Sequence, residues 1–202
     1  MASEKDICNL ALRRLGQSVG LIDTGEDSAY AEVAKDCYPI VRDALLERHA
    51  WNFATTRVRV PEIAGEVIGL GKRYAVPSDC IRILSVLPAE GSEEDGLEAR
   101  WVVENAGDVN VIQTEIEKPI LKYVRRVRNT DIFSAGFTDA LAWHLAATLA
   151  GPIVKGEQGQ TVGVKLLQQA NLAERQAITF DVNQRRTMNY ERRVPYFYDR
   201  ES

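Results

Sequence analysis

Apolar residues recur at helical spacing in two stretches near the start of the printed sequence. The first follows Ser3, whose side chain can cap a helix together with Asp6 three residues later. The second has apolar residues at the i, i+3, i+4, i+7 positions of a helix, namely Tyr30, Val33, Ala34, Cys37, Tyr38, Val41, Ala44 and Leu45. Pro39 interrupts this second helix. Because proline lacks an amide proton and its ring clashes with the preceding turn, we expect a kink or a split near Asp36.

The middle of the chain has the alternating pattern and the turn residues that are typical of β-strands. Turns at Pro77–Asp79 and Asn105–Asp108, and an acidic loop at Glu90–Gly96, separate its candidate strands. The pattern predicts strands at Cys80–Val86, Arg100–Glu104, Val109–Thr114 and Ile120–Val127. Before them, Asn52–Val60 also alternates, and Val67–Val76 contains two glycines. We expect the segments to form one small antiparallel sheet of about four or five strands.

Helical spacing returns in the last third of the chain. The stretch Phe137–Ala150 has large apolar residues on one face, and the remainder of the helix is rich in alanine, which allows helices to approach closely. A final helix is expected to begin near Gln160. The sequence therefore predicts an α+β fold in which a small antiparallel β-sheet domain, residues 52–129, is inserted between the second and third helices of a four-helix bundle domain, residues 1–51 and 130–182.

The segment 183–202 is different, because it has no amphipathic period and no core to join. It contains tyrosine, phenylalanine and arginine, the residue types that anchor protein interfaces. Its candidate partner-binding residues are Arg192, Arg193, Tyr196, Phe197 and Tyr198. We therefore expect an extended C-terminal arm that docks on a partner.

Composition narrows the possible classes of protein. The chain has 202 residues, of which 45% are hydrophobic and 27% are charged, as in an ordinary globular protein. Its net charge of −4 argues against a strongly basic nucleic-acid binder. We expect no secretory signal and no bilayer-spanning segment, so the protein would be made in a reducing cytoplasm, with Cys8, Cys37 and Cys80 as free thiols.

The residues that could support catalysis or metal binding do not form a recognisable motif. The two histidines, His49 and His144, lack a nucleophile elbow nearby, and structural roles are the preferred interpretation for both. Cysteine and histidine spacings do not match a zinc site. Gly65–Arg73 resembles a phosphate-binding loop only superficially, and a glycine-bearing β-hairpin fits it better. We therefore expect no catalytic residue, no metal and no cofactor.

Charged and aromatic clusters have simple structural interpretations. The acidic run at Glu93–Asp95 has the composition of a solvated turn. Lys122, Arg126 and Arg128 would share one face of a strand and Arg125 the other. This run is the one candidate for phosphate contact, but a solvated face or a row of salt bridges between subunits is the preferred interpretation. Trp51 and Phe53, which follow the second helix, are expected to join the helical bundle to the sheet.

The order of several motifs resembles a known family. The chain has a helix ending in Leu15-Gly16, then WNFA at Trp51–Ala54, YAVPSDCIRIL at Tyr74–Leu84 and a helix containing LAATLA at Leu145–Ala150. In this order they resemble the tail tubular protein A family of short-tailed phages and their prophages, over Ser3–Ala177. The resemblance implies a dodecameric ring that lies between the portal and the tail nozzle, with the genomic DNA passing through its central channel.

The function expected from this resemblance is that of a structural virion protein, a head-to-tail adaptor without enzymatic activity. The C-terminal arm would bind the portal, and the protein would reside at the head-to-tail junction of the virion after synthesis in the host cytoplasm. One alternative is a small phage-encoded peptidoglycan hydrolase that uses paired carboxylates. Another is a regulatory DNA-binding protein, which the acidic balance and the lack of a helix-turn-helix signal disfavour.

Overall fold

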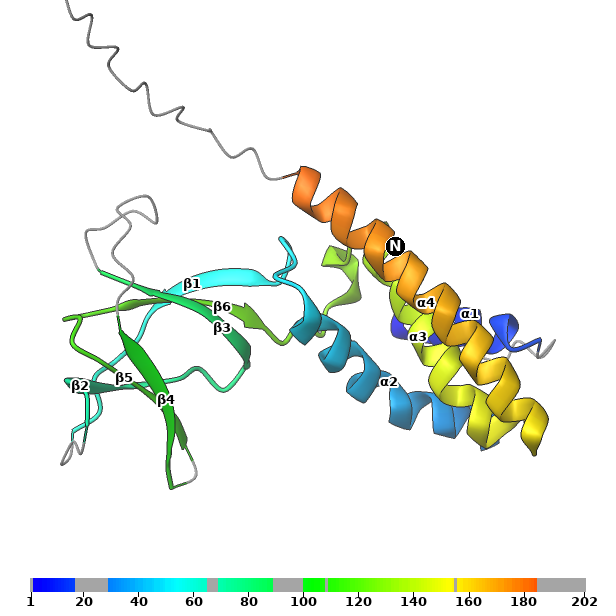
Figure 1. Ribbon diagram of the computed structural model, residues 1–202, viewed down its shortest axis with the longest axis horizontal. Helices are drawn as coiled ribbons and strands as arrows, with labels where there is room; N and C mark the ends of the chain where they lie inside the picture. The colour runs from blue at the N-terminus through cyan, green and yellow to red at the C-terminus, as the bar shows by residue number, and fades with distance from the viewer. Residues whose placement is uncertain are drawn as a thin grey trace, which may run out of the picture.

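The chain combines four α-helices with two small antiparallel sheets among the residues that the structure, a computed structural model, describes (Figure 1). Those residues are 2–16, 29–64, 69–88, 100–107, 109–154 and 156–184. The mixed α+β class expected from the sequence is confirmed. All six strands lie between the second and third helices in chain order.

The helices are α1 (Glu4–Arg14), α2 (Ala29–Arg48), α3 (Ala135–Ile153) and α4 (Glu157–Asn183). The predicted cap of α1 is confirmed: the Ser3 hydroxyl accepts a bond from the Asp6 amide at 3.2 Å, and the Asp6 carboxylate accepts one from the Ser3 amide at 2.8 Å. These reciprocal bonds satisfy amide groups that have no partner inside the helix. Ser134 caps α3 in a similar way.

Two helix predictions need correction. The expected split of the second helix is wrong, because α2 is one unbroken helix through Pro39. The neighbouring Tyr38 is fully buried, so packing of this segment offsets the hydrogen bond that proline cannot make. The last helix begins at Glu157, before Gln160, directly after Gly156, whose φ of 81° suits glycine.

The strands form two three-stranded sheets, so the expectation of one sheet with four or five strands is wrong. One sheet has the order β1-β6-β3 and the other β2-β5-β4. The strands are β1 (Thr55–Arg59), β2 (Lys72–Ala75), β3 (Cys80–Leu87), β4 (Trp101–Ala106), β5 (Val109–Thr114) and β6 (Ile120–Arg125). Alternation along a strand indicates which of its residues share a face, but not which other strand pairs with it. Here β6 pairs with β1 and β3, which are distant in the chain.

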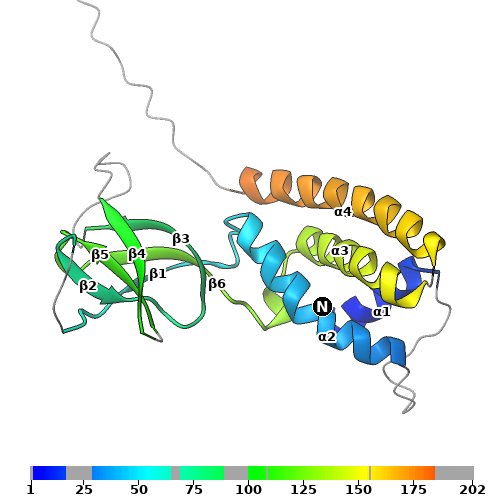
Figure 2. The same cartoon turned by 60° about the horizontal axis from the view of Figure 1, so that its bottom comes forward.

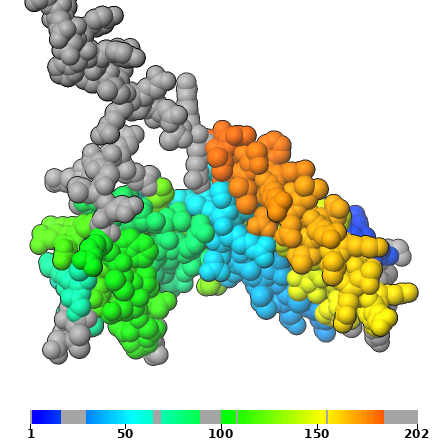
Figure 3. Space-filling model, viewed as in Figure 1, coloured from blue at the N-terminus to red at the C-terminus, as the bar shows by residue number. Residues whose placement is uncertain are grey.

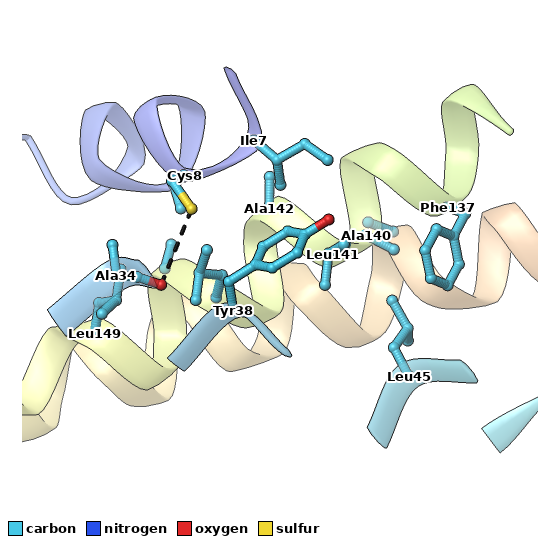
Figure 4. Close-up of a cluster of buried hydrophobic side chains, with 14 of the residues drawn as sticks. Ile7, Cys8, Ala34, Tyr38, Leu45, Phe137, Ala140, Leu141, Ala142 and Leu149 are labelled. Carbon is cyan, nitrogen blue, oxygen red and sulfur yellow. Dashed lines mark hydrogen bonds between the residues drawn. The ribbon is translucent and has the colours of Figure 1, made fainter. Parts of the chain in front are cut away.

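Two separate hydrophobic clusters hold these elements together. The larger lies among the helices, where Tyr38 of α2 points toward Leu141 and Ala142 of α3 and the Cys8 thiol of α1 donates to the Ala34 carbonyl at 3.9 Å (Figure 4). The smaller lies between the sheets and consists of Val60, Tyr74, Val86, Ile112, Leu121 and Tyr123. Strand residues also enter the larger cluster, since Val124 of β6 belongs to it and Ile81 and Leu84 of β3 pack against it.

Close approach of α3 and α4 depends on small residues. A Cβ atom added at Gly136 of α3 would lie 3.0 Å from the Cβ of Ala177 in α4. In the first turn of α4, a Cβ at Gly159 would lie 1.8 Å from the Val154 carbonyl oxygen, so only glycine fits there. Figure 2 shows the result, with α3 lying between α2 and α4.

Candidate interaction surface

A groove of about 680 Å³ lies among α2, α3 and α4. We call it the apolar groove. Its lining consists of Ile40, Val41, Ala44, Leu45, Arg48, His144, Ala147, Thr148, Gly151, Gly159, Gln160, Gly163, Val164 and Leu167. On the face drawn in Figure 3, α2 (blue) and α4 (orange to yellow) both reach the surface. Small residues of α3 form the floor, so another element can approach the helix closely.

Large apolar side chains project from the rim of this groove. Ile40 of α2 is 71% exposed, and Val164 and Leu167 of α4 are 58% and 45% exposed. Single exposed apolar residues are normal, but several around one apolar concavity are characteristic of a surface that another protein covers. Grooves of this form accept an apolar helix face in known modes of recognition.

Sequence reasoning missed this rim. Ile40 lies outside the apolar set that identifies the second helix, Val164 lies between Gly163 and Lys165, and Leu167 directly follows the buried Leu166. The sequence signal that could have revealed the rim was an apolar residue on a helix face that carries no other core residue. Without knowledge of the neighbouring helix, such a residue cannot be distinguished from scattered surface hydrophobics.

A buried polar cluster lies beneath the groove. The Glu174 carboxylate accepts hydrogen bonds from His144 Nε2 at 2.8 Å and from Arg48 Nη1 at 2.9 Å. Because a carboxylate only accepts, Nε2 of His144 carries the proton. His144 is 6% exposed, and burial lowers its pKa despite the opposing effect of Glu174. The cluster connects α2, α3 and α4.

The second histidine also contacts a carboxylate of α4. His49 Nε2 lies 3.1 Å from Asp181 Oδ2, and the Asn52 amide donates to Asp181 Oδ1 at 3.1 Å. The Asn52 side chain donates to the Asp181 carbonyl at 2.6 Å. These bonds hold the end of α4 against the segment that connects α2 to β1. The buried carboxylates Glu174 and Asp181 thus face basic or amide groups and not one another.

Aromatic rings form the joint between helices and strands. Trp51 contacts Phe137 edge-on with centroids 5.0 Å apart, and its indole Nε1 donates to the Leu45 carbonyl at 3.0 Å. Phe53 stacks against Phe133 and Phe137 at 5.4 and 5.0 Å. Trp51 and Phe53 both pack in the large hydrophobic cluster, and the sequence did not identify Phe133 as their neighbour.

The predicted row of cations on one strand is partly wrong. β6 ends at Arg125, so Arg126 and Arg128 lie beyond it. Arg126 Nε instead contacts Asp43 of α2 at 2.7 Å. The cause is Val127, which enters the helical cluster and draws the chain away from the sheet after β6. Lys122 remains on the strand.

The described part of Gly65–Arg73 has the character expected of a glycine-bearing turn. Glu62 and Tyr74 form an antiparallel bridge across it, and Gly71 has a φ of 58°. A Cβ at Gly71 would lie 2.3 Å from the Thr114 carbonyl oxygen. Several predicted groups lie outside the described residues, namely the acidic run Glu93–Asp95 and the arm residues Arg192, Arg193, Tyr196, Phe197 and Tyr198.

The described residues offer little for metal or thiol chemistry. Within them, no group of three or more histidine, cysteine or acidic side chains is placed to hold a metal ion. Burial raises the pKa of Cys8 to about 12 and that of Cys80 to about 11, which makes both thiols weak nucleophiles. None of the described helices combines the length and the apolar character needed to span a membrane.

Compared with known proteins, the chain matches no protein-family model and no curated sequence. The resemblance to the tail tubular protein A family therefore depends on the order of its sequence motifs alone.

Proposed function

We propose that this protein is a structural head-to-tail adaptor of a phage virion, which forms a ring between the portal and the tail nozzle or tube and lets genomic DNA pass through its centre. The observation that carries the proposal is the apolar groove with its exposed rim of Ile40, Val164 and Leu167. A surface of this kind suits a protein that acts through contacts with other subunits.

The proposed architecture is a helical domain formed by residues 1–51 and 130–182, with a β domain of residues 52–129 inserted into it. The small cluster, which is built from residues of this segment alone, supports the division, and Val124 and Val127 join the segment to the larger cluster of the helices. In an adaptor, such a division would assign different neighbours to the two parts. The helical domain would supply the contacts between subunits, and the β domain would be available to the nozzle or the DNA.

A closed ring needs two different surfaces on each subunit, one complementary to the other. The groove is one such surface. The other is proposed to be the side of α4 that carries Leu172 and Phe180, which are 52% and 68% exposed. At about 100° per residue, these two side chains lie roughly 130–150° around α4 from the residues that line the groove. An apolar projection on one side and a groove on another suit a head-to-tail contact.

The experiment that tests this function is sedimentation of the purified chain with and without portal rings. The expected result is a ring bound to the portal, of dodecameric mass. The variant Phe180→Ser should remain folded but lose ring formation, whereas Arg13→Ser, at an exposed polar position of α1 that belongs to neither proposed surface, should form rings normally. A protein that remains monomeric with both portal and nozzle present would refute the adaptor function.

The C-terminal arm has a separate proposed role, which is attachment to the portal through Arg192, Arg193, Tyr196, Phe197 and Tyr198. Its support is the interface-like composition of the segment. Deletion of residues 184–202 should leave a folded protein that no longer attaches to portal rings. Unchanged attachment of the truncated protein would contradict this role without affecting the proposed contact between subunits.

A further inference from the structure

The exposed rim of the apolar groove is unfavourable in a subunit that has not yet assembled. Ile40, Val164 and Leu167 are 71%, 58% and 45% exposed around one concavity. Proteins that remain single rarely leave an apolar surface of this kind uncovered, because it promotes aggregation. The groove therefore calls for an occupant even before a neighbouring subunit binds there.

The lining of the groove suits flat apolar groups that carry a polar edge. Its floor consists of small residues, and a Cβ added at Gly151 would meet no atom within 4 Å. Thr148 and Gln160 add exposed polar groups to the same lining. The volume of about 680 Å³ is in the range of pockets that enclose a small ligand. Tyrosine and phenylalanine rings match this combination, since a tyrosine ring is apolar and its hydroxyl seeks a polar partner.

The charge in the groove favours an occupant that has a carboxylate beside its rings. Among the lining residues that the structure describes, Arg48 alone carries a full charge. Its Nη1 contacts Glu174 at 2.9 Å, and its side chain is nevertheless 48% exposed. A carboxylate of the occupant could therefore approach the same guanidinium. Because this contact would be open to solvent, it would orient the occupant more than hold it.

One segment of this chain has the composition that the groove requires. Tyr196, Phe197 and Tyr198 form an aromatic run, and Asp199 follows it directly. We call these three residues the aromatic run. They belong to residues 185–202, which lie outside the part of the chain that the structure describes.

The length of chain after α4 allows the aromatic run to reach the groove of its own molecule. Tyr196 follows Asn183, the last residue of α4, by 13 residues, which span up to about 43 Å when extended. The α4 residues that line the groove, from Gly159 to Leu167, lie about 24–36 Å back along the helix axis from Asn183. A tethered segment has an effective concentration of the order of mM, far above that of a second copy at low protein concentration. The segment of the same chain is therefore the favoured occupant.

We infer that the aromatic run occupies the apolar groove of its own chain in the unassembled protein. The consequence of this contact rests on the proposed function, in which the groove receives the next subunit and the aromatic run binds the portal. Attachment of the run to the portal would then uncover the groove. The contact is thus autoinhibitory, and it restricts the joining of subunits to places where a portal ring is present.

Photo-crosslinking of the full chain tests this inference. Phe197 is replaced by p-benzoylphenylalanine, a photoreactive amino acid that keeps an aromatic side chain at this position. The protein is irradiated without portal rings at about 1 µM, where contacts within one chain dominate over contacts between copies. Peptide mass spectrometry should then locate crosslinks in the monomer at residues of the groove rim, namely Ile40, Val164 and Leu167.

Two leucine variants provide a matched comparison. Leu167 and Leu172 are 45% and 52% exposed on the same helix, but only Leu167 belongs to the groove lining. Leu167→Ser should lower the yield of the groove crosslink by up to about tenfold, the effect of removing one leucine side chain from a contact. Leu172→Ser should leave the yield unchanged. Circular dichroism would establish that both variants are folded.

Three results would overturn the inference. They are the lack of crosslinks to the groove, equal yields in the two leucine variants, and crosslinked dimers as the main product, which would assign the groove to the segment of a second copy. Ring formation and portal attachment are measured in separate samples and do not depend on these results. Conversely, groove crosslinks in a protein that never forms rings would reject the adaptor function and leave this contact in place.

Discussion

The helical part and the strand part of this protein are stabilised in different ways. In the helical part, α1, α2 and α4 each have an apolar side, α3 is apolar nearly all round, and a broad cluster that includes Leu141, Tyr38 and Trp51 fills the space between them. In the strand part, two three-stranded sheets enclose only a small cluster around Leu121. The helical part therefore has the larger reserve of buried apolar surface, and the strand part depends more on turns and on register.

This difference also separates the surfaces that each part offers. The helical part exposes apolar side chains at the rim of its groove, whereas the β1-β6-β3 sheet carries basic residues at exposed positions, Arg57 and Arg59 among them. Apolar surface favours lasting contact with another subunit, whereas an exposed basic surface favours weak and salt-dependent contact. The comparison predicts that mutations in the two parts will affect different properties.

The largest expected effect comes from emptying the core of the helical part. Leu141→Ala should reduce the free energy of unfolding by about 3–5 kcal/mol, because Leu141 is fully buried in the middle of the large cluster. Leu121→Ala in the small cluster should cost less, about 2–3 kcal/mol, since two small sheets can move together to fill the space. Urea denaturation measures both, and equal or reversed costs would contradict the comparison.

A glycine substitution probes the strand part, where turns are expected to matter most. Gly71→Ala should cost about 1–3 kcal/mol, because Gly71 has a φ of 58° and an added Cβ would collide with the Thr114 carbonyl. Gly151→Ala on α3 is the control, since a Cβ there meets no atom within 4 Å, and it should be neutral or slightly stabilising. Thermal melts of both variants measure these effects. Equal losses of stability in the two variants would refute the requirement for glycine at position 71.

The buried His144 predicts a dependence of stability on pH. Burial lowers its pKa in the folded state below the ordinary value of 6.5, so the folded protein binds the proton less readily than the unfolded chain. This contribution to stability is fully present above that ordinary value and is lost as the pH falls below it. His144→Gln should remove the corresponding slope between pH 7 and pH 5, as measured by urea denaturation at each pH. A slope that persists in the variant would locate the titrating group elsewhere.

A smaller effect is expected at the start of α1. Ser3→Ala should reduce the free energy of unfolding by about 1 kcal/mol, because the Asp6 amide loses its acceptor. Ser3→Asp should restore most of the stability, since aspartate also caps helices. Equal stability of the Ser3→Ala variant and the unchanged protein would show that the end of α1 contributes nothing to the helical part.

The smallest effect on stability is expected at an exposed position of the β1-β6-β3 sheet. Arg57→Gln should change the free energy of unfolding by less than about 0.5 kcal/mol, because Arg57 lies exposed on the outer strand β1. The measurement is again urea denaturation. A clear loss of stability would mean that Arg57 has a structural role.

The sequence was sufficient to predict the helices and most strand positions, because helical spacing and alternation are local patterns. It did not predict that six strands divide into two sheets, since the partners of β6 lie far away in the chain. The sequence also did not predict the apolar groove. Its rim combines Ile40 with Val164, and only the packing of α2 and α4 around α3 brings them to one place.

The two histidines illustrate the same limit at the level of single residues. Composition and spacing favoured structural roles for His49 and His144, but could not identify Asp181 and Glu174 as their partners. Those partners are more than 29 residues away in sequence. They face the histidines only because α4 packs against α3 and the end of α2.

The central claim is that the protein acts through contacts between subunits, and the mass of its assembly tests this most directly. Mass photometry would compare the unchanged protein with Ile40→Ser and with Phe180→Ser, each in the presence of portal rings. The account predicts portal-bound rings for the unchanged protein and no rings for either variant, although both variants remain folded. Rings of normal mass in both variants, or a monomer in all three samples, would contradict it.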